Sequence, residues 1–217
     1  MKFKLLAVLA AAMVFATSSA WATSVTFNFS GCPTSSFPGS CPGNLGTPTA
    51  TYSMSGLSVT LTGYNGAATN NLYVKNTPVP EDGVGLAGTS DNEINSGQYI
   101  YLNMSNLLSH GITKGTLDVS SLQSGEVGMV CDTTAAGMPG TSGCMSVTEM
   151  GSSGTNSAAI SWSSADPFVD LTASSGNVLL GESLSVMPIP EPASLALLGL
   201  GLLGAGILTR KKSFLHS

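Results

Sequence analysis

Basic residues are almost absent from the middle of this chain of 217 residues. Between residues 23 and 189, Lys75 and Lys114 are the only lysines or arginines, against eleven acidic residues, so this part has a formal charge of −9. A surface of that sign repels phosphate groups, which excludes nucleic acid as a partner and disfavours binding of this part to anionic lipids. Neutral sugars and divalent cations remain as candidate ligands.

Motifs of known catalytic sites are also missing. The chain has no Gly-x-Ser-x-Gly elbow, no His-Glu-x-x-His pair and no phosphate-binding P-loop. The one histidine of the middle part, His110, precedes Gly111 and is typical of a solvated turn residue. A triad with one of the many serines, or a pair of glycosidase carboxylates, stays open as the hydrolase alternative. Because no spacing favours either arrangement, we predict that the protein is not an enzyme.

No long segment between the two ends has helical periodicity. Short runs alternate apolar and polar residues instead, as in Val25–Phe29 and Leu57–Leu61, and Gly, Pro, Asn or Ser separates them, which is the pattern of strands and turns. We expect ten strands, at residues 24–29, 57–62, 71–75, 99–104, 115–119, 125–130, 145–150, 158–162, 168–172 and 178–186. Their number and spacing predict an all-β domain over residues 23–186, an antiparallel β-sandwich or jelly roll.

The four cysteines all lie in this domain: Cys32, Cys41, Cys131 and Cys144. An even number in an exported chain predicts two disulfide bonds, and four cysteines allow three connectivities. Local pairing, Cys32 with Cys41 and Cys131 with Cys144, would close two loops rich in Pro, Gly and Ser and stabilise the fold by about 2–3 kcal/mol for each bond. A four-cysteine metal site lacks the usual Cys-x-x-Cys spacing.

The N-terminus has the three parts of a secretory signal peptide. Lys2 and Lys4 precede an apolar core of 12 residues, Leu5–Ala16, and Ala20-Trp21-Ala22 offers small residues for cleavage after Ala22. The apolar core is too short for a membrane anchor. We therefore predict that residues 1–22 are a signal peptide and that the following domain is exported across the inner membrane.

The C-terminus has an apolar run of 16 residues, Ala193–Leu208, followed by the basic cluster Arg210-Lys211-Lys212. A helix of this run is about 24 Å long at about 1.5 Å per residue, against a hydrocarbon core of roughly 30 Å, and snorkelling of the basic side chains closes the gap. We predict a transmembrane helix over 193–209, with the basic cluster as the stop-transfer signal of a cytoplasmic tail, 210–217. By itself this pattern also fits a permanent single-span anchor.

Pro190-Glu191-Pro192 directly precedes the apolar run. The order of this motif, a span rich in Gly, Leu and Ala, and a basic cluster resembles the PEP-CTERM protein-sorting signal, here at residues 187–217. The same segment is also called the ice-binding protein C-terminal domain, a label that carries no implication of ice binding here. The resemblance implies that an exosortase, a membrane-embedded transpeptidase-like protease, cuts near the motif and releases or transfers the exported part.

A second resemblance lies within the domain. Four segments are similar to a type of ectodomain that is often attached to PEP-CTERM tails: Gly83–Ile94, Tyr99–Leu107, Gly125–Val127 and Gly176–Leu180. This similarity supports the sandwich and implies no activity.

Taken together, these features predict an exported, non-catalytic protein that is associated with an exopolysaccharide matrix or the cell surface. Its precursor would lie in the inner membrane and face the periplasm, and its processed form would lie at the cell surface or outside the cell. The expected partners are the exosortase, the export machinery, the membrane through the C-terminal helix, and a polysaccharide. The alternative is a carbohydrate-binding module that uses Tyr99, Tyr101 or Trp162 as stacking faces.

One acidic segment is a candidate metal site. Asp91-Asn92-Glu93 follows Glu81-Asp82 by ten residues, and clustered oxygen ligands on a loop suit Ca²⁺. The competing interpretation is a polar turn in which Asp91 and Asn92 bond to their own backbone. Apart from this possible Ca²⁺, the sequence predicts no cofactor.

Overall fold

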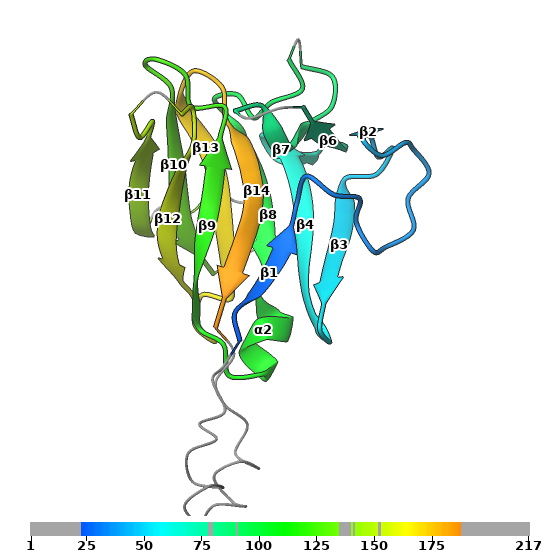
Figure 1. Cartoon of the computed structure of the whole chain (residues 1–217), viewed down its shortest axis with the longest axis vertical. Coiled ribbons are helices and arrows are strands. Elements are labelled where there is room, and N and C mark those ends of the chain that lie inside the picture. The colour runs from blue at the N-terminus through cyan, green and yellow to red at the C-terminus, as the bar shows by residue number, and fades with distance from the viewer. Residues whose placement is uncertain are drawn as a thin grey trace, which may run out of the picture. The chain divides into compact units, whose positions relative to one another are not determined.

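The structure is a computed structural model that describes residues 23–77, 80–89, 91–134, 140, 142–151 and 153–187. Residues 24–188 form one compact unit, and in this unit two antiparallel sheets pack face to face as a β-sandwich (Figure 1). The all-β prediction is therefore confirmed for the domain. The predicted transmembrane helix over 193–209 lies outside the described residues.

Over the described residues, each sheet has seven strands. Sheet A has the order β12 (Asn156–Ser161), β9 (Lys114–Ser120), β14 (Leu179–Val186), β7 (Asp82–Leu86), β6 (Leu72–Asn76) and β2 (Gly43–Asn44), and β1 (Val25–Asn28) also pairs with β14. Sheet B has the order β11 (Ser142–Thr148), β10 (Val127–Thr133), β13 (Phe168–Ser175), β8 (Gln98–Asn103), β4 (Leu57–Asn65) and β3 (Thr49–Met54), and β5 (Ala68–Thr69) pairs with β4. A short helix, α2 (Ser105–Ser109), follows β8.

The last eight strands pair in a nested way. β10 pairs with β11, β9 with β12, β8 with β13 and β7 with β14, and successive pairs alternate between the two sheets. This nesting is the strand order of a jelly roll. It places β14, the last strand in the described part of the chain, inside sheet A, between β9 and β7.

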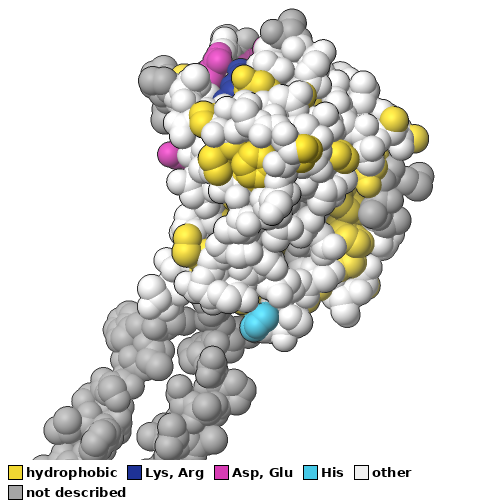
Figure 2. All heavy atoms as spheres, turned by 90° about the vertical axis from the view of Figure 1, so that its right-hand side faces the viewer, with side chains coloured by type: hydrophobic (Ala, Val, Ile, Leu, Met, Phe, Trp, Pro, Cys, Tyr) yellow, Lys and Arg dark blue, Asp and Glu magenta, His cyan; other side chains and the backbone are white. Residues whose placement is uncertain are grey.

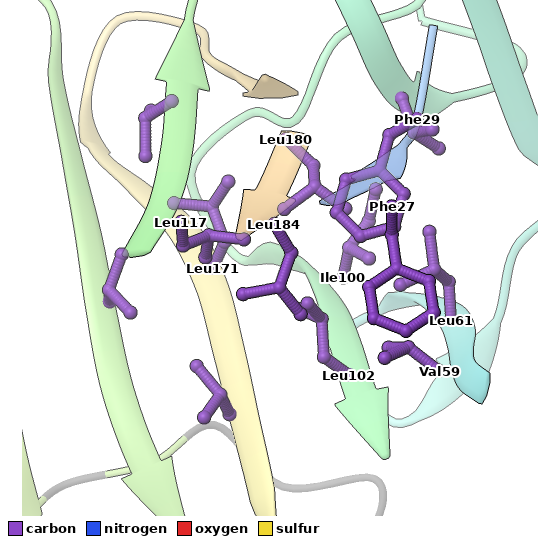
Figure 3. Close-up of a cluster of buried hydrophobic side chains, with 14 of the residues drawn as sticks. Phe27, Phe29, Val59, Leu61, Ile100, Leu102, Leu117, Leu171, Leu180 and Leu184 are labelled. Atoms are coloured by element: carbon purple, nitrogen blue, oxygen red, sulfur yellow. The ribbon is translucent and has the colours of Figure 1, made fainter. Parts of the chain in front are cut away.

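The core lies between the two sheets. In Figure 3, Phe27 from β1 and Leu180 and Leu184 from β14 point toward Leu61, Ile100 and Leu102 of sheet B. On β4 every second residue from Leu57 to Gly63 is buried, as expected for a strand with one face on the core. Burial of these apolar faces is the main stabilising contribution to the fold.

Both disulfide bonds join local partners, Cys32 with Cys41 and Cys131 with Cys144. The first closes a loop between β1 and β2, and the second links β10 to β11 across their hairpin. The structure thus decides among the three connectivities that the sequence left open.

All ten predicted strands are present, and four strands and the helix were not predicted. β2 and β5 have two residues each, so they offer no periodicity. β3 could have been predicted from the sequence and was missed, because its buried residues Ala50 and Tyr52 alternate with exposed or half-exposed residues. β7 reads Asp-Gly-Val-Gly-Leu, and two glycines in five residues argue against a strand.

The glycines of β7 are required by close packing. A Cβ atom on Gly83 would lie 2.0 Å from the carbonyl oxygen of Leu180, and one on Gly85 would lie 2.0 Å from that of Asn92. Both distances are far below van der Waals contact, so the backbone approaches these positions because no side chain is present.

Gly85→Ala should therefore destabilise the domain, because the backbone around Asn92 must move to admit a methyl group. We expect a loss of about 1–3 kcal/mol in the free energy of unfolding, as overpacked sites show, measured by urea denaturation. Gly31→Ala is the control, because the nearest atom to its Cβ would lie at 3.7 Å. Equal stability of the two variants would contradict the close-packing explanation.

Candidate functional site

Lys75 is the centre of the acidic cluster that the sequence singled out. Its ammonium group, on β6, lies 2.6 Å from Oε1 of Glu93 and 3.2 Å from Oε2 of Glu81. The side chains of Lys75 and Glu93 are only 12% and 5% exposed. A carboxylate buried to this extent needs a positive partner, because an unpaired charge in the interior is strongly unfavourable.

Further hydrogen bonds tie the cluster to the turn after β9. Ser121 Oγ donates to Oε1 of Glu93 at 2.9 Å, and Gln123 Nε2 donates to Oε1 of Glu81 at 3.2 Å. Burial raises the pKa of Glu93 by more than its bonds with Lys75 and Ser121 lower it. Oε1 of Glu93 and both carboxylate oxygens of Glu81 are thus engaged within the protein. Sequence reasoning missed Lys75 and Ser121 because only the fold brings β6 and the β9 turn to Glu93.

Asp91 bonds to its local backbone, as the competing interpretation of a polar turn predicts for this residue. Oδ1 of Asp91 accepts a hydrogen bond from the backbone N–H of Glu93 at 3.1 Å, and Oδ2 accepts one from Nδ2 of Asn177. Asn92 has a φ of 60°, a left-handed conformation that Asn tolerates. In the described ranges, no group of three or more His, Cys, Asp or Glu side chains is placed to hold a metal ion. Calcium binding at Asp91, Asn92 and Glu93 stays a prediction.

A hollow of about 340 Å³ opens on the side of sheet A that faces away from the core. Three carboxylates line it: Asp82 of β7, Asp118 of β9 and Glu182 of β14. Ser183 Oγ donates to Oδ2 of Asp118 at 2.6 Å, and burial together with the charge of Glu182 raises the pKa of Asp82. Pro80, Val119, Ser120, Met150, Ser153, Thr155, Asn156 and Ser157 complete the lining.

This hollow presents acceptor oxygens beside hydroxyl groups and a few apolar side chains. Such a lining suits a ligand rich in hydroxyl groups or with a positive charge. The sequence did not indicate it, because its acidic residues come from three strands that are adjacent only after folding.

The predicted stacking residues are not available to a sugar. Tyr99 and Tyr101 are each 2% exposed and Trp162 is 4% exposed. Trp162 packs in the core and donates its Nε1–H to the carbonyl of Ile112 at 2.8 Å. Tyr99 stacks on Tyr64, with ring centroids 5.1 Å apart. The prediction of an exposed aromatic platform at Tyr99, Tyr101 or Trp162 is therefore wrong.

Asp170 is a fully buried acid in β13. It lies opposite Cys131 of β10 and Tyr101 of β8, next to the Cys131–Cys144 disulfide. Its Oδ2 accepts the backbone N–H of Gly140 at 2.9 Å, while Oδ1 has no hydrogen-bond partner in the described part of the chain. Burial raises the pKa of Asp170 from 3.8 to about 6, and the charge of Asp132 adds to this.

His110 follows the short helix α2 and is exposed. Its Nδ1 lies 2.9 Å from the carbonyl oxygen of Asn106 and 3.2 Å from Oγ of Ser109. These are local contacts of the helix end. His110 is thus placed as the turn residue that the sequence indicated.

Several predicted site residues lie outside the described ranges. These are the signal-cleavage residues Ala20 and Ala22, the motif Pro190-Glu191-Pro192 and the basic cluster Arg210-Lys211-Lys212. Among the residues that are described, no helix is long and apolar enough to cross a membrane.

The domain is thus a disulfide-bonded β-sandwich whose last strand, β14, ends at Val186. Residues 188–212, directly after it, match the family model described as the PEP-CTERM protein-sorting motif. The chain therefore carries a PEP-CTERM protein-sorting signal in its C-terminal segment. Such a signal implies a secreted protein that is anchored transiently in the membrane and then exported. Comparison of the chain with curated proteins and with solved structures finds no match.

Asp170→Asn should change how stability depends on pH. The native pKa of Asp170, about 6, lies above the ordinary value of 3.8, so the native state binds a proton at a higher pH than the unfolded chain does. The wild-type stability from this group is therefore full below about pH 4 and is lost as the pH rises through 6. Asn keeps the acceptor for Gly140 without the charge, so the loss of stability between pH 4 and 7 should be smaller in the variant.

Thermal unfolding across this pH range measures the effect. Asp166→Asn, in the turn before β13, is the control for removal of one negative charge. If Asp170→Asn and the wild type lose the same stability between pH 4 and 7, the account of Asp170 is wrong.

Proposed function

We propose that this protein is a non-catalytic component of the cell surface or of an exopolysaccharide matrix, and that an exosortase delivers it there. The observation that carries the proposal is the position of the sorting motif. β14 ends at Val186 and the matched motif begins at residue 188. The motif thus follows a finished domain and interrupts no part of the strand ladder.

The construction of the domain supports export of a folded cargo. Cleavage at the motif would leave all strand pairs intact, because the last paired residue is Val186. Both disulfide bonds suit an oxidising compartment outside the cytoplasm. A formal charge of −9 over residues 23–189 favours a soluble, hydrated surface protein.

A non-catalytic role has its own support. Nδ1 of His110 contacts a backbone carbonyl and a neighbouring serine rather than a carboxylate. The buried carboxylate of Glu93 is paired with Lys75. These contacts support structural roles for His110 and Glu93. They favour a sorted component of the surface or matrix over an enzyme.

Replacing Pro190, Glu191 and Pro192 together by Ala should leave the protein unprocessed in the membrane fraction. Wild-type protein should instead appear in the surface or extracellular fraction without its C-terminal segment. Fractionation followed by mass spectrometry of the intact protein measures both the location and the new C-terminus.

Phe214→Ala together with Leu215→Ala is the matched control, since both residues follow the matched motif. This control should be processed like the wild type. Normal processing of the Pro-Glu-Pro variant would refute sorting through this motif.

A second candidate function is carbohydrate binding, and the hollow on sheet A favours it. Asp82, Asp118 and Glu182 offer carboxylate oxygens that can accept hydrogen bonds from sugar hydroxyls, and Asn156 can donate one. Pro80 and Met150 supply apolar contacts in place of the buried aromatic rings. Binding here would attach the exported domain to a polysaccharide.

Affinity electrophoresis in polysaccharide gels tests this function. The double variant Asp118→Asn and Glu182→Gln should lose retardation that the wild type shows, because two acceptors change to neutral amides in the hollow. Asp166→Asn combined with Glu126→Gln removes the same charge elsewhere and should behave like the wild type. The absence of retardation of the wild type in neutral and amino-sugar gels would exclude this function.

Running the same gels with millimolar Ca²⁺ and with a chelator also tests the calcium prediction. Stronger retardation with Ca²⁺, lost in Glu93→Gln, would support a calcium-dependent site at Asp91, Asn92 and Glu93. Equal retardation in both gels, together with an unchanged melting temperature in Ca²⁺, would remove that prediction.

A further inference from the structure

The two sides of the sandwich differ in how the edges of the sheets are protected. Sheet A ends at β12 and β2, and sheet B ends at β11 and β3. Figure 1 shows β11 and β12 together on the left side of the sandwich, and β2 and β3 on the right. An edge strand has backbone N–H and C=O groups that can pair with another chain, so natural proteins cover such edges or protect them with charged residues or proline.

The loop between β1 and β2, which a disulfide bond closes, covers the edges on the right side. Thr34 N donates to the carbonyl of Thr51 in β3 at 2.8 Å. Ser40 N donates to the carbonyl of Asn44 in β2, also at 2.8 Å, and Phe37 of the same loop packs against the core. Figure 2 looks onto this side and shows a band of hydrophobic side chains across it. The chain itself therefore occupies these two edges.

The outer edge of β12 is open. Trp162 N, directly after β12, donates to the carbonyl of Thr113, directly before β9, at 2.9 Å. In an antiparallel pair, residues that bond to the neighbouring strand alternate with residues whose N–H and C=O groups point away from it. Ser157, Ala159 and Ser161 therefore direct their backbone groups toward the open edge. Among the described residues, no hydrogen bond engages the backbone of Ala159 on this side.

β12 also lacks the usual protection of an edge strand. It reads Asn-Ser-Ala-Ala-Ile-Ser, with no charged residue and no proline. The side chains of Ser157, Ala159 and Ser161 are small and exposed. Met145 of β11 lines a small hollow together with Ala159 and is 38% exposed, and Met150, between β11 and β12, is 70% exposed. This side thus presents an uncharged edge beside apolar surface, in a domain whose formal charge is −9.

The open edge is complementary to a second copy of itself. A two-fold axis at Ala159, perpendicular to the sheet, places Ala159 opposite Ala159 and Ser157 opposite Ser161 of the second copy. In this register the outward-pointing backbone groups of both copies meet, so Ala159 N of each copy donates to the carbonyl of Ala159 of the other. Ser157 N already donates to Oδ1 of Asn156 at 2.8 Å. The Ala159 pair is therefore the centre of the contact.

Charge favours the same arrangement. Asp118 of β9 lies opposite Ser157, and Lys114 of β9 lies opposite Ser161. The antiparallel contact therefore places Asp118 of one copy in the same row of the joined sheet as Lys114 of the other, about 14 Å apart at roughly 4.8 Å per strand. Lys114 is exposed and has no ion pair among the described residues. The attraction occurs twice across the axis and offsets part of the repulsion between two acidic domains.

We propose that two copies of this chain pair edge to edge through β12 and join their A sheets into one continuous antiparallel sheet. The two-fold axis passes through the Ala159 pair. It keeps the outer faces of both sheets on the same side, so the two hollows lined by Asp82, Asp118 and Glu182 open on one face of the dimer. This inference goes beyond the proposed function and depends neither on sorting nor on a ligand in the hollow.

Cysteine cross-linking of the full chain, in the cells that export it, tests the pairing. Ala159→Cys places one thiol from each copy at the axis, where the Cα atoms of a hydrogen-bonded pair lie about 5.5 Å apart, a distance that a disulfide bond can span. Ala68→Cys, in the exposed strand β5, is the matched control. Non-reducing electrophoresis of total protein, with mass spectrometry of the bands, should give several-fold more covalent homodimer for Ala159→Cys than for Ala68→Cys.

The register has its own test, in which two differently tagged copies are expressed together. Ser157→Cys in one copy and Ser161→Cys in the other should cross-link several-fold more with each other than either does with itself. Ala159→Lys in both copies should lower this heterodimer several-fold, because two like charges then meet at the axis. The side chain at 159 is exposed, so this variant should fold.

Absence of the Ala159→Cys homodimer would overturn the proposal. So would self-linkage of Ser157→Cys as strong as its linkage to Ser161→Cys, or linkage of Ala159→Cys to a different protein. Because total protein is analysed, these outcomes are distinct from a failure of sorting, which the Pro-Glu-Pro variant reports.

Discussion

The fold depends on the insertion of the last strand, β14, between strands formed earlier in the chain. β14 is hydrogen-bonded to β9 on one side and to β7 and β1 on the other, and its residues Leu180, Leu184 and Val186 lie in the core. An inner strand satisfies backbone groups on both of its edges, so sheet A is complete only when residue 186 is in place. The sorting motif begins two residues later, so it directly follows the last strand of the domain.

The fold accommodates its buried and half-buried carboxylates in different ways. Glu93 is buried against Lys75. Asp170 is buried, accepts a hydrogen bond from the backbone N–H of Gly140 and has a raised pKa. Asp82, Asp118 and Glu182 share a hollow that remains open to water. The placement of these carboxylates is a property of the fold rather than of the composition.

Periodicity found the strands that alternate clearly and missed those whose residues serve close packing. The core strands at Leu57–Asn65 and Leu179–Val186 carry regular apolar positions, so their prediction succeeded. β7 was missed because its glycines, Gly83 and Gly85, are needed where the backbone of Leu180 and of Asn92 comes close. No local sequence pattern reveals such a contact. The tyrosines were misjudged for a related reason. Tyr99 and Tyr101 point away from the core cluster, yet other groups cover them, and an alternating pattern does not predict what covers the second face of a sheet.

The sequence by itself determined the C-terminal sorting motif, the β-rich fold class and the presence of two disulfide bonds. These features depend on composition and on residues that are adjacent in the chain. Tertiary structure decided which cysteines pair, which cation neutralises Glu93 and where the acidic hollow opens. Each of these features joins residues that are far apart in the chain, so it depends on the order of strands across two sheets. That order is set by the packing of the whole core, and no single segment contains it.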